Sequence, residues 1–91
     1  MLNEELYEEL EHEFTRYRVD EEVEDILLEL AEALADMGIT GREISVKEQA
    51  GHAKLTAYGI CEDGEEGEAP GVYIKTLVIN EKEFEIEDYF L

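Results

Sequence analysis

The spacing of apolar residues predicts a helix at the start of the chain. Within residues 3–17 the apolar side chains recur at helical spacing and, at about 100° per residue, fall within one arc of about 100°. They are Leu6, Tyr7, Leu10, Phe14 and Tyr17. Asn3 is a suitable N-cap, and the glutamates that follow it favour the positive end of the helix dipole.

A second helical pattern begins after a short break at residues 18–20. Asp20 is expected to be the N-cap, with Glu21 and Glu22 in the first turn, and Gly38 is placed to end the helix. The apolar positions with helical spacing are Val23, Ile26, Leu27, Leu30, Ala31, Leu34 and Met37. The short link predicts that the two helices form an antiparallel hairpin or cross at a steep angle.

After Gly41 the apolar period changes from about 3.6 residues to 2, and β-branched residues and tyrosines become frequent. This pattern predicts strands at residues 43–48, 53–61 and 72–79, and a fourth strand that begins at 83–86. Turns are expected at residues 49–52 and 80–81, and a loop at 62–70. Residues 88–91 either continue the last strand or pack as an apolar tail.

The predicted fold class is therefore α+β, with two N-terminal helices packed on a four-stranded antiparallel β-meander in the order ααββββ. A chain of 91 residues is expected to form one domain, residues 1–91. Its hydrophobic share of 44% is enough for a core, although 36% of the residues are charged, against roughly 25% in an ordinary globular domain. The excess charge is expected on the surface of a folded protein.

The charge is strongly unbalanced, with 26 acidic against 7 basic residues and a formal net charge of -19. Direct binding of nucleic acid is not expected, because phosphate contacts need a basic surface, and attraction to anionic membranes is not expected for the same reason. An acidic domain attracts basic surfaces instead, including those that proteins use to hold DNA or RNA.

Two elements concentrate the acidic residues. The second helix presents a row within an arc of about 80°, uninterrupted by Lys or Arg; it consists of Glu21, Asp25, Glu29, Glu32 and Asp36. In the last hairpin alternate positions are acidic, so these side chains are expected to face one way while Phe84 and Ile86 face the other; they are Glu81, Glu83, Glu85 and Glu87. We interpret both rows as partner-binding residues. The alternatives are a solvated helix face and an edge strand protected from aggregation by charge.

No motif for catalysis or for a cofactor is found, and the chain is not expected to be an enzyme. Ser45 lies in a predicted strand, and His12 and His52 are isolated in sequence; a pair of Cys61 with His52 across a hairpin lacks an activating group. The acidic loop at 62–70 lacks the spacing of an EF-hand, so no metal is expected. The lone cysteine, the lack of a signal sequence and the lack of a long apolar run indicate a cytoplasmic protein.

In its size, its charge and its lack of a catalytic motif, the chain resembles the broad class of phage-encoded nucleic-acid mimics, such as anti-restriction and anti-CRISPR proteins. That resemblance implies an inhibitor that occupies the basic surface of a nucleic-acid-binding protein in a host cytoplasm. Two alternatives remain open. The chain could be an acidic adaptor or subunit, including a homodimer formed through the sheet, or an ordinary domain of a halophile, although its acids are mostly Glu rather than Asp.

Overall fold

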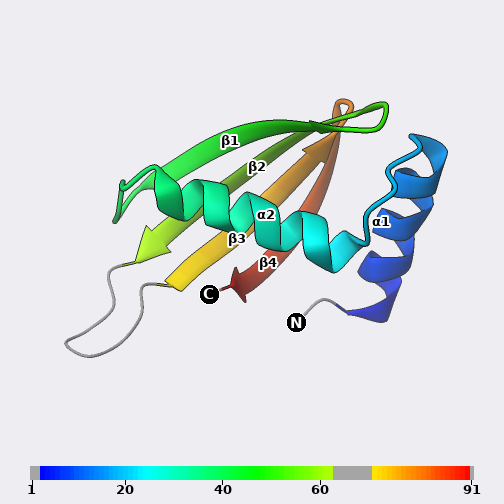
Figure 1. Ribbon diagram of the computed structural model, residues 1–91. Helices are drawn as coiled ribbons and strands as arrows, with labels where there is room; N and C mark the ends of the chain where they lie inside the picture. The colour runs from blue at the N-terminus through cyan, green and yellow to red at the C-terminus, as the bar shows by residue number, and fades with distance from the viewer. Residues whose placement is uncertain (1–2, 63–70, 91) are drawn as a thin grey trace.

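The computed structural model describes residues 3–62 and 71–90, which form two helices followed by four strands (Figure 1). The helices are α1 (Glu4–Arg16) and α2 (Val23–Asp36), and the strands are β1 (Glu43–Ala50), β2 (Ala53–Glu62), β3 (Gly71–Ile79) and β4 (Lys82–Phe90). The strands form one antiparallel sheet in the order β1-β2-β3-β4. The predicted α+β meander is confirmed.

Helix α1 begins and ends with hydrogen bonds that its sequence provides. The Asn3 side chain accepts a hydrogen bond from the Leu6 amide at 2.7 Å, as expected of an N-cap. At the other end Arg18 adopts a left-handed conformation (φ 57°), and the Val19 amide donates to the Phe14 carbonyl at 2.9 Å. This is a Schellman motif with arginine where glycine is usual. It turns the chain away from α1 and sends Val19 toward the core.

Helix α2 begins later than the sequence indicated. The predicted N-cap was Asp20, but the helix begins at Val23 with Glu22 as its cap residue, and Glu22 makes no side-chain capping hydrogen bond. Residues 19–22 form a link between the helices, because Val19 packs against the core there. The prediction for the other end is confirmed, since Gly38 directly follows the C-cap Met37 and has a φ of 68°.

The hairpin turns fix the register of the sheet. Asn80 and Glu81 both have positive φ, 44° and 75°, which is the conformation of a type I′ turn between β3 and β4. The β1–β2 turn is shorter than predicted and consists of Gly51 and His52 alone. Residues 88–90 continue the fourth strand, which decides between the two predicted alternatives.

A β-bulge interrupts β4. The pairing of β3 with β4 shifts between Ile74 and Thr76, so that Ile86 and Glu87 lie opposite the single residue Lys75. Glu87 adopts a positive φ of 47° at this point. The simple alternation expected for the last strand therefore ends at Ile86.

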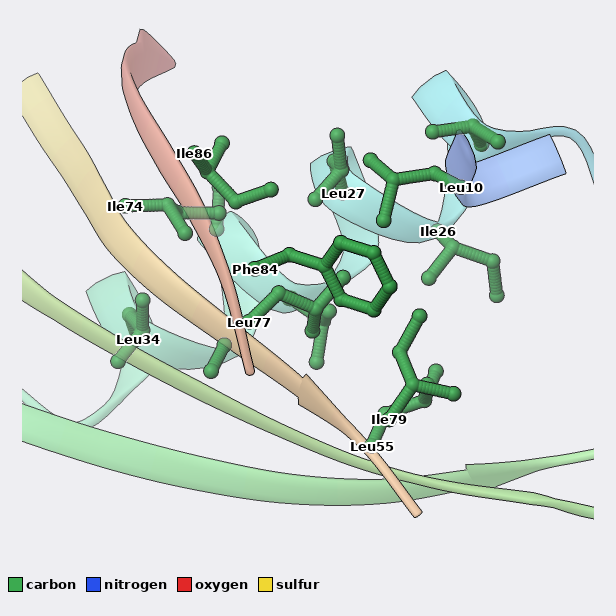
Figure 2. Close-up of a cluster of buried hydrophobic side chains, with 14 of the residues drawn as sticks. Leu10, Ile26, Leu27, Leu34, Leu55, Ile74, Leu77, Ile79, Phe84 and Ile86 are labelled. Carbon is green, nitrogen blue, oxygen red and sulfur yellow. The ribbon is translucent and has the colours of Figure 1, made fainter. Parts of the chain in front are cut away.

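The core lies between α2 and one face of the sheet, with α1 closing the end near the hairpin turns (Figure 1). Figure 2 shows Phe84 of β4 among side chains from both helices and the sheet, including Leu10, Ile26 and Leu77. Gly59 of β2 lies against α2 and β3: a Cβ there would be 3.1 Å from the Leu34 side chain and 2.3 Å from the Tyr73 carbonyl oxygen.

The two hairpin turns and the end of α1 are joined by hydrogen bonds. The His52 amide donates to the Tyr17 carbonyl at 2.7 Å, which ties the β1–β2 turn to the end of α1. The Asn80 side chain accepts from the Lys54 amide at 2.8 Å and donates to the His52 carbonyl at 3.2 Å. Residues far apart in sequence thus hold the position of α1 at the end of the sheet.

Candidate acidic binding surface

The exposed side of α2 carries four of the predicted site residues. Opposite them the helix buries Ile26, Leu30 and Leu34 against the sheet. Because helical positions three and four residues apart share a face, the carboxylates project into solvent as a single row. The four exposed residues are Asp25, Glu29, Glu32 and Asp36.

Glu21 belongs to this row although it precedes the helix. The link places its carboxyl near that of Glu29, two turns into α2, so that the charge of Glu21 affects the pKa of Glu29. The pKa of Glu29 is raised above its ordinary value of 4.5, first by the charge of Glu21, then by desolvation and by the neighbouring carboxylates Asp25 and Glu32. We define the acidic ridge as Glu21, Asp25, Glu29, Glu32 and Asp36.

The acidic ridge lacks counter-ions within the described part of the chain. The two ion pairs seen there are Lys82–Glu13 and Lys75–Glu43, and neither involves the ridge. Arg18 lines the same surface depression as Glu21 and Glu29 but forms no ion pair with either. The negative potential of the ridge is therefore not neutralised by other side chains within residues 3–62 and 71–90.

The acidic surface continues from the ridge toward α1. A shallow pocket of about 190 Å³ at the junction of the two helices is lined by side chains that include Tyr7, Glu11 and Glu22. The pKa of Tyr7 is raised above its ordinary value of 10.0 by desolvation first and then by nearby carboxylates, beginning with Glu11 and Glu24. Tyr7 therefore presents a neutral phenol surrounded by negative charge.

Sequence reasoning missed Leu28, which is 43% exposed on α2. By helical spacing its neighbours on the surface are Glu24, Asp25 and Glu32. An exposed leucine between carboxylates is suited to anchor a partner, because hydrophobic contacts at the centre of an interface contribute much of its affinity. Leu28 lies outside the stripe of apolar residues that the helix buries, and this position was the only feature of the sequence that indicated its exposure. Met37 was predicted in the buried stripe but is 42% exposed just beyond the helix.

The predicted row in the last hairpin does not form as expected. Glu81 lies in the turn and Glu87 in the β-bulge, so only Glu83 and Glu85 keep the alternating arrangement. These two point away from the buried Phe84, toward the sheet face that α2 does not cover. The acidic ridge and the β4 glutamates therefore lie on opposite sides of the sheet, because α2 covers the face to which Phe84 contributes.

The structure does not bring together the residues considered for chemistry. Cys61 is 4% exposed at the far end of β2, and burial raises the pKa of its thiol. His52 precedes the other end of β2, and the nine residue steps from His52 to Cys61 along the extended chain span about 30 Å. The pair across a hairpin is therefore excluded. Most of the predicted acidic loop, residues 63–70, lies outside the described part of the chain.

Within residues 3–62 and 71–90 no group of three or more His, Cys, Asp or Glu side chains is arranged to hold a metal ion. In the same part of the chain neither helix is long and apolar enough to cross a membrane. Comparisons with protein-family models, with curated proteins and with solved structures gave no match to the chain.

Proposed function

We propose that the chain is a non-enzymatic binding protein whose acidic ridge occupies a basic protein surface that otherwise holds a nucleic acid. The observation that carries the proposal is the row of exposed carboxylates on α2 without counter-ions among the described residues. Such a row costs folding free energy, because like charges one helical turn apart repel by a few tenths of a kcal/mol per pair. A basic partner would remove that repulsion on binding.

The charge spacing of the ridge supports a nucleic-acid-binding protein as the partner. Asp25 and Asp36 are separated by about 16 Å of helix axis at 1.5 Å per residue, and four carboxylates lie within that length. A nucleic-acid strand carries one charge per about 3.4 Å of axis, or about five over the same distance. A groove with basic side chains placed for phosphates would therefore find a similar density of negative charge on α2.

Rigidity and an apolar anchor add to the electrostatic term. The ridge stands on a helix whose opposite side is fully buried, so little conformational entropy is lost when it docks. Leu28 supplies apolar contact beside the charges. Charge complementarity mainly raises the association rate and selects the partner, whereas a desolvated leucine slows dissociation.

The proposal is tested by affinity capture with the immobilised chain, in the presence and absence of duplex DNA and of single-stranded RNA. The captured proteins are expected to be nucleic-acid-binding proteins, to elute as salt is raised and to be displaced by one of the nucleic acids. Reversal of three ridge charges together, Asp25→Lys, Glu29→Lys and Glu32→Lys, is expected to abolish capture.

The matched control changes the same number of charges on α1, with Glu5→Lys, Glu8→Lys and Glu9→Lys, all of which are exposed. This control should retain capture if the ridge is the contact surface. If the control and the ridge variant lose capture equally, net charge alone explains binding and the proposal is wrong. Capture that depends on the ridge but resists both nucleic acids would instead identify an acidic adaptor.

The halophile alternative makes a different prediction about the chain alone. A domain whose acidity is an adaptation to high salt should lose its far-ultraviolet circular dichroism at low salt. A binding protein with this core is expected to keep its helical and strand signal in dilute buffer. Loss of the circular dichroism signal in dilute buffer would indicate that the acidity is an adaptation to high salt and not a binding surface.

A further inference from the structure

The sheet face that α2 leaves uncovered differs in charge from the rest of the molecule. We call it the open face; within residues 43–62 and 71–86 its outward side chains include three of the chain's seven basic residues and four of its 26 acidic ones. They are Lys47, Lys54, Lys75, Glu43, Glu62, Glu83 and Glu85. On a chain with a net charge of -19, this face is therefore nearly neutral.

The middle of the open face is less polar than its edges. On the two central strands it carries Thr56, Tyr58, Ile60, Tyr73, Thr76 and Val78. Tyr58 is 36% exposed, and the other five are half-buried although no described helix packs over them. The charged residues on these two strands are Lys54, Glu62 and Lys75, and Lys75 pairs with Glu43 at 3.9 Å. A tyrosine-containing surface with few charges, over which no described helix packs, is typical of the centre of a protein interface.

The charges at the two edges are arranged in register. Lys47 on β1 pairs across the sheet with Thr56, Thr56 with Val78, and Val78 with Glu83 on β4. Lys47 and Glu83 thus stand at opposite ends of one cross-strand row, three interstrand spacings or about 14 Å apart. They are too far apart to pair within one chain, and no ion pair joins them. The next row runs from Ser45 to Glu85 in the same way.

This arrangement is self-complementary. If a second copy stacks its open face on the first about a two-fold axis parallel to the strands, the β4 edge of one copy lies over the β1 edge of the other. Lys47 of each copy then meets Glu83 of the other, and Tyr58 meets Thr76. Two sheets stack in this aligned manner at about 10 Å, and the inclination of about 30° that their twist requires preserves the symmetry.

We propose that the open face is the interface of a symmetric homodimer, in which Lys47 of each copy pairs with Glu83 of the other. The charges favour a second copy of the chain as the partner of the open face, because the dimer axis brings Lys47 of one copy opposite Glu83 of the other at both edges. The acidic ridges of the two copies then lie on the outer sides of the dimer, so their mutual repulsion is reduced by their separation and by salt. The proposal is independent of what the acidic ridge binds.

The size of the face places the proposed dimer among small protein interfaces. Four strands about 4.8 Å apart and eight residues of about 3.3 Å each cover on the order of 500 Å² per copy, or about 1,000 Å² in the dimer. That is at the lower limit of specific interfaces, so we expect dissociation in the micromolar range. Sedimentation velocity over about 5 to 200 μM at roughly physiological salt covers this range.

The native chain is expected to sediment as a species of twice its 10.4 kDa mass at the upper concentrations. Lys47→Glu and Glu83→Lys should each weaken the dimer by about ten-fold or more, because each places like charges opposite one another at both edges. The double variant restores opposite charges with the native net charge and should return to within about three-fold of the native constant. Tyr58→Asp, at the centre of the face, should give only monomer.

Matched controls carry the same charge changes on α1. Arg16→Glu corresponds to Lys47→Glu, and Glu8→Lys corresponds to Glu83→Lys; both positions are exposed and neither lies on the open face. They should leave the dimer constant nearly unchanged. A native chain that stays monomeric at about 200 μM overturns the proposal, as does a dimer that Tyr58→Asp leaves intact or a double variant that is not restored. Circular dichroism confirms that each variant is folded.

Discussion

Lys82 at the start of β4 donates a hydrogen bond from Nζ to Glu13 Oε1 of α1 at 3.2 Å, and so joins two residues that are 69 positions apart in the sequence. The Glu13 side chain is only 5% exposed, whereas that of Lys82 is 63% exposed. Lys82 also lies 5.2 Å above the Phe84 ring. The ammonium group therefore balances a buried carboxylate at the place where α1 meets the sheet.

Replacing Lys82 by Met is expected to lower the free energy of unfolding by about 1–3 kcal/mol, because a buried carboxylate loses its charged partner. Urea denaturation followed by circular dichroism measures the change. Lys54→Met is the control, since Lys54 is exposed and forms no ion pair with any other described residue. Adding Glu13→Met to Lys82→Met should recover part of the loss. If Lys82→Met lowers the free energy of unfolding no more than the control does, the burial of Glu13 does not require its ion pair with Lys82.

Gly51→Ala is expected to destabilise the fold by about 2 kcal/mol or more, because two penalties coincide at this turn. Gly51 has a φ of 55°, and a Cβ there would lie 2.3 Å from the Arg18 carbonyl oxygen. Backbone atoms of both the turn and the end of α1 would have to move apart. Thermal unfolding measures the effect. Gly41→Ala is a matched control, because it has a φ of 78° but nothing within 4 Å of its Cβ position. Equal losses of stability at Gly51 and Gly41 would show that the close approach of residue 51 to the Arg18 carbonyl adds nothing to the destabilisation.

Glu29→Gln is expected to stabilise the chain at pH 7 and to have little effect near pH 4. The neighbouring carboxylates raise the pKa of Glu29 above 4.5, so the folded state binds its proton more tightly than the unfolded state does. The stabilisation from this proton is present at low pH and is lost as the pH rises through the folded pKa. Glutamine removes the repulsion that remains above that pH.

The measurement for Glu29→Gln is the free energy of unfolding in denaturant at both pH values and at two salt concentrations. Added salt should reduce the gain at pH 7, because the side chain is exposed and its interactions are screened. Glu8→Gln on α1 is the matched control for loss of one negative charge. A gain that is equal at pH 4 and pH 7 would contradict the electrostatic explanation.

The elements with strong apolar periodicity were predicted well from the sequence. The N-cap at Asn3, the position of Gly38 after α2 and the turn at Asn80 and Glu81 all follow from local chemistry, and the structure confirms them. The start of α2 was predicted wrongly at Asp20. Local capping preferences favoured aspartate. The Schellman motif at Arg18 instead directs Val19 against the core, so the chain begins α2 only after this contact.

The candidate site was predicted only in part. The row on α2 depends on helical period alone, so Asp25, Glu29 and Glu32 are exposed together as expected. Glu21 reaches Glu29 by a non-helical route that periodicity cannot describe. The β4 row failed at Glu87, because a bulge depends on pairing with β3 rather than on the residues of β4.

The sequence by itself determined the number and order of the elements and the strong negative charge, because hydrophobic period, turn residues and composition act locally or as sums. Only the tertiary structure decided which charged residues share a surface. Packing α2 on one face of the sheet separates the acidic ridge from Glu83 and Glu85 and leaves the other face open. The strand register then places Lys47 and Glu83 in one row. These relations join residues distant in the chain, so they follow from long-range packing rather than from local pattern.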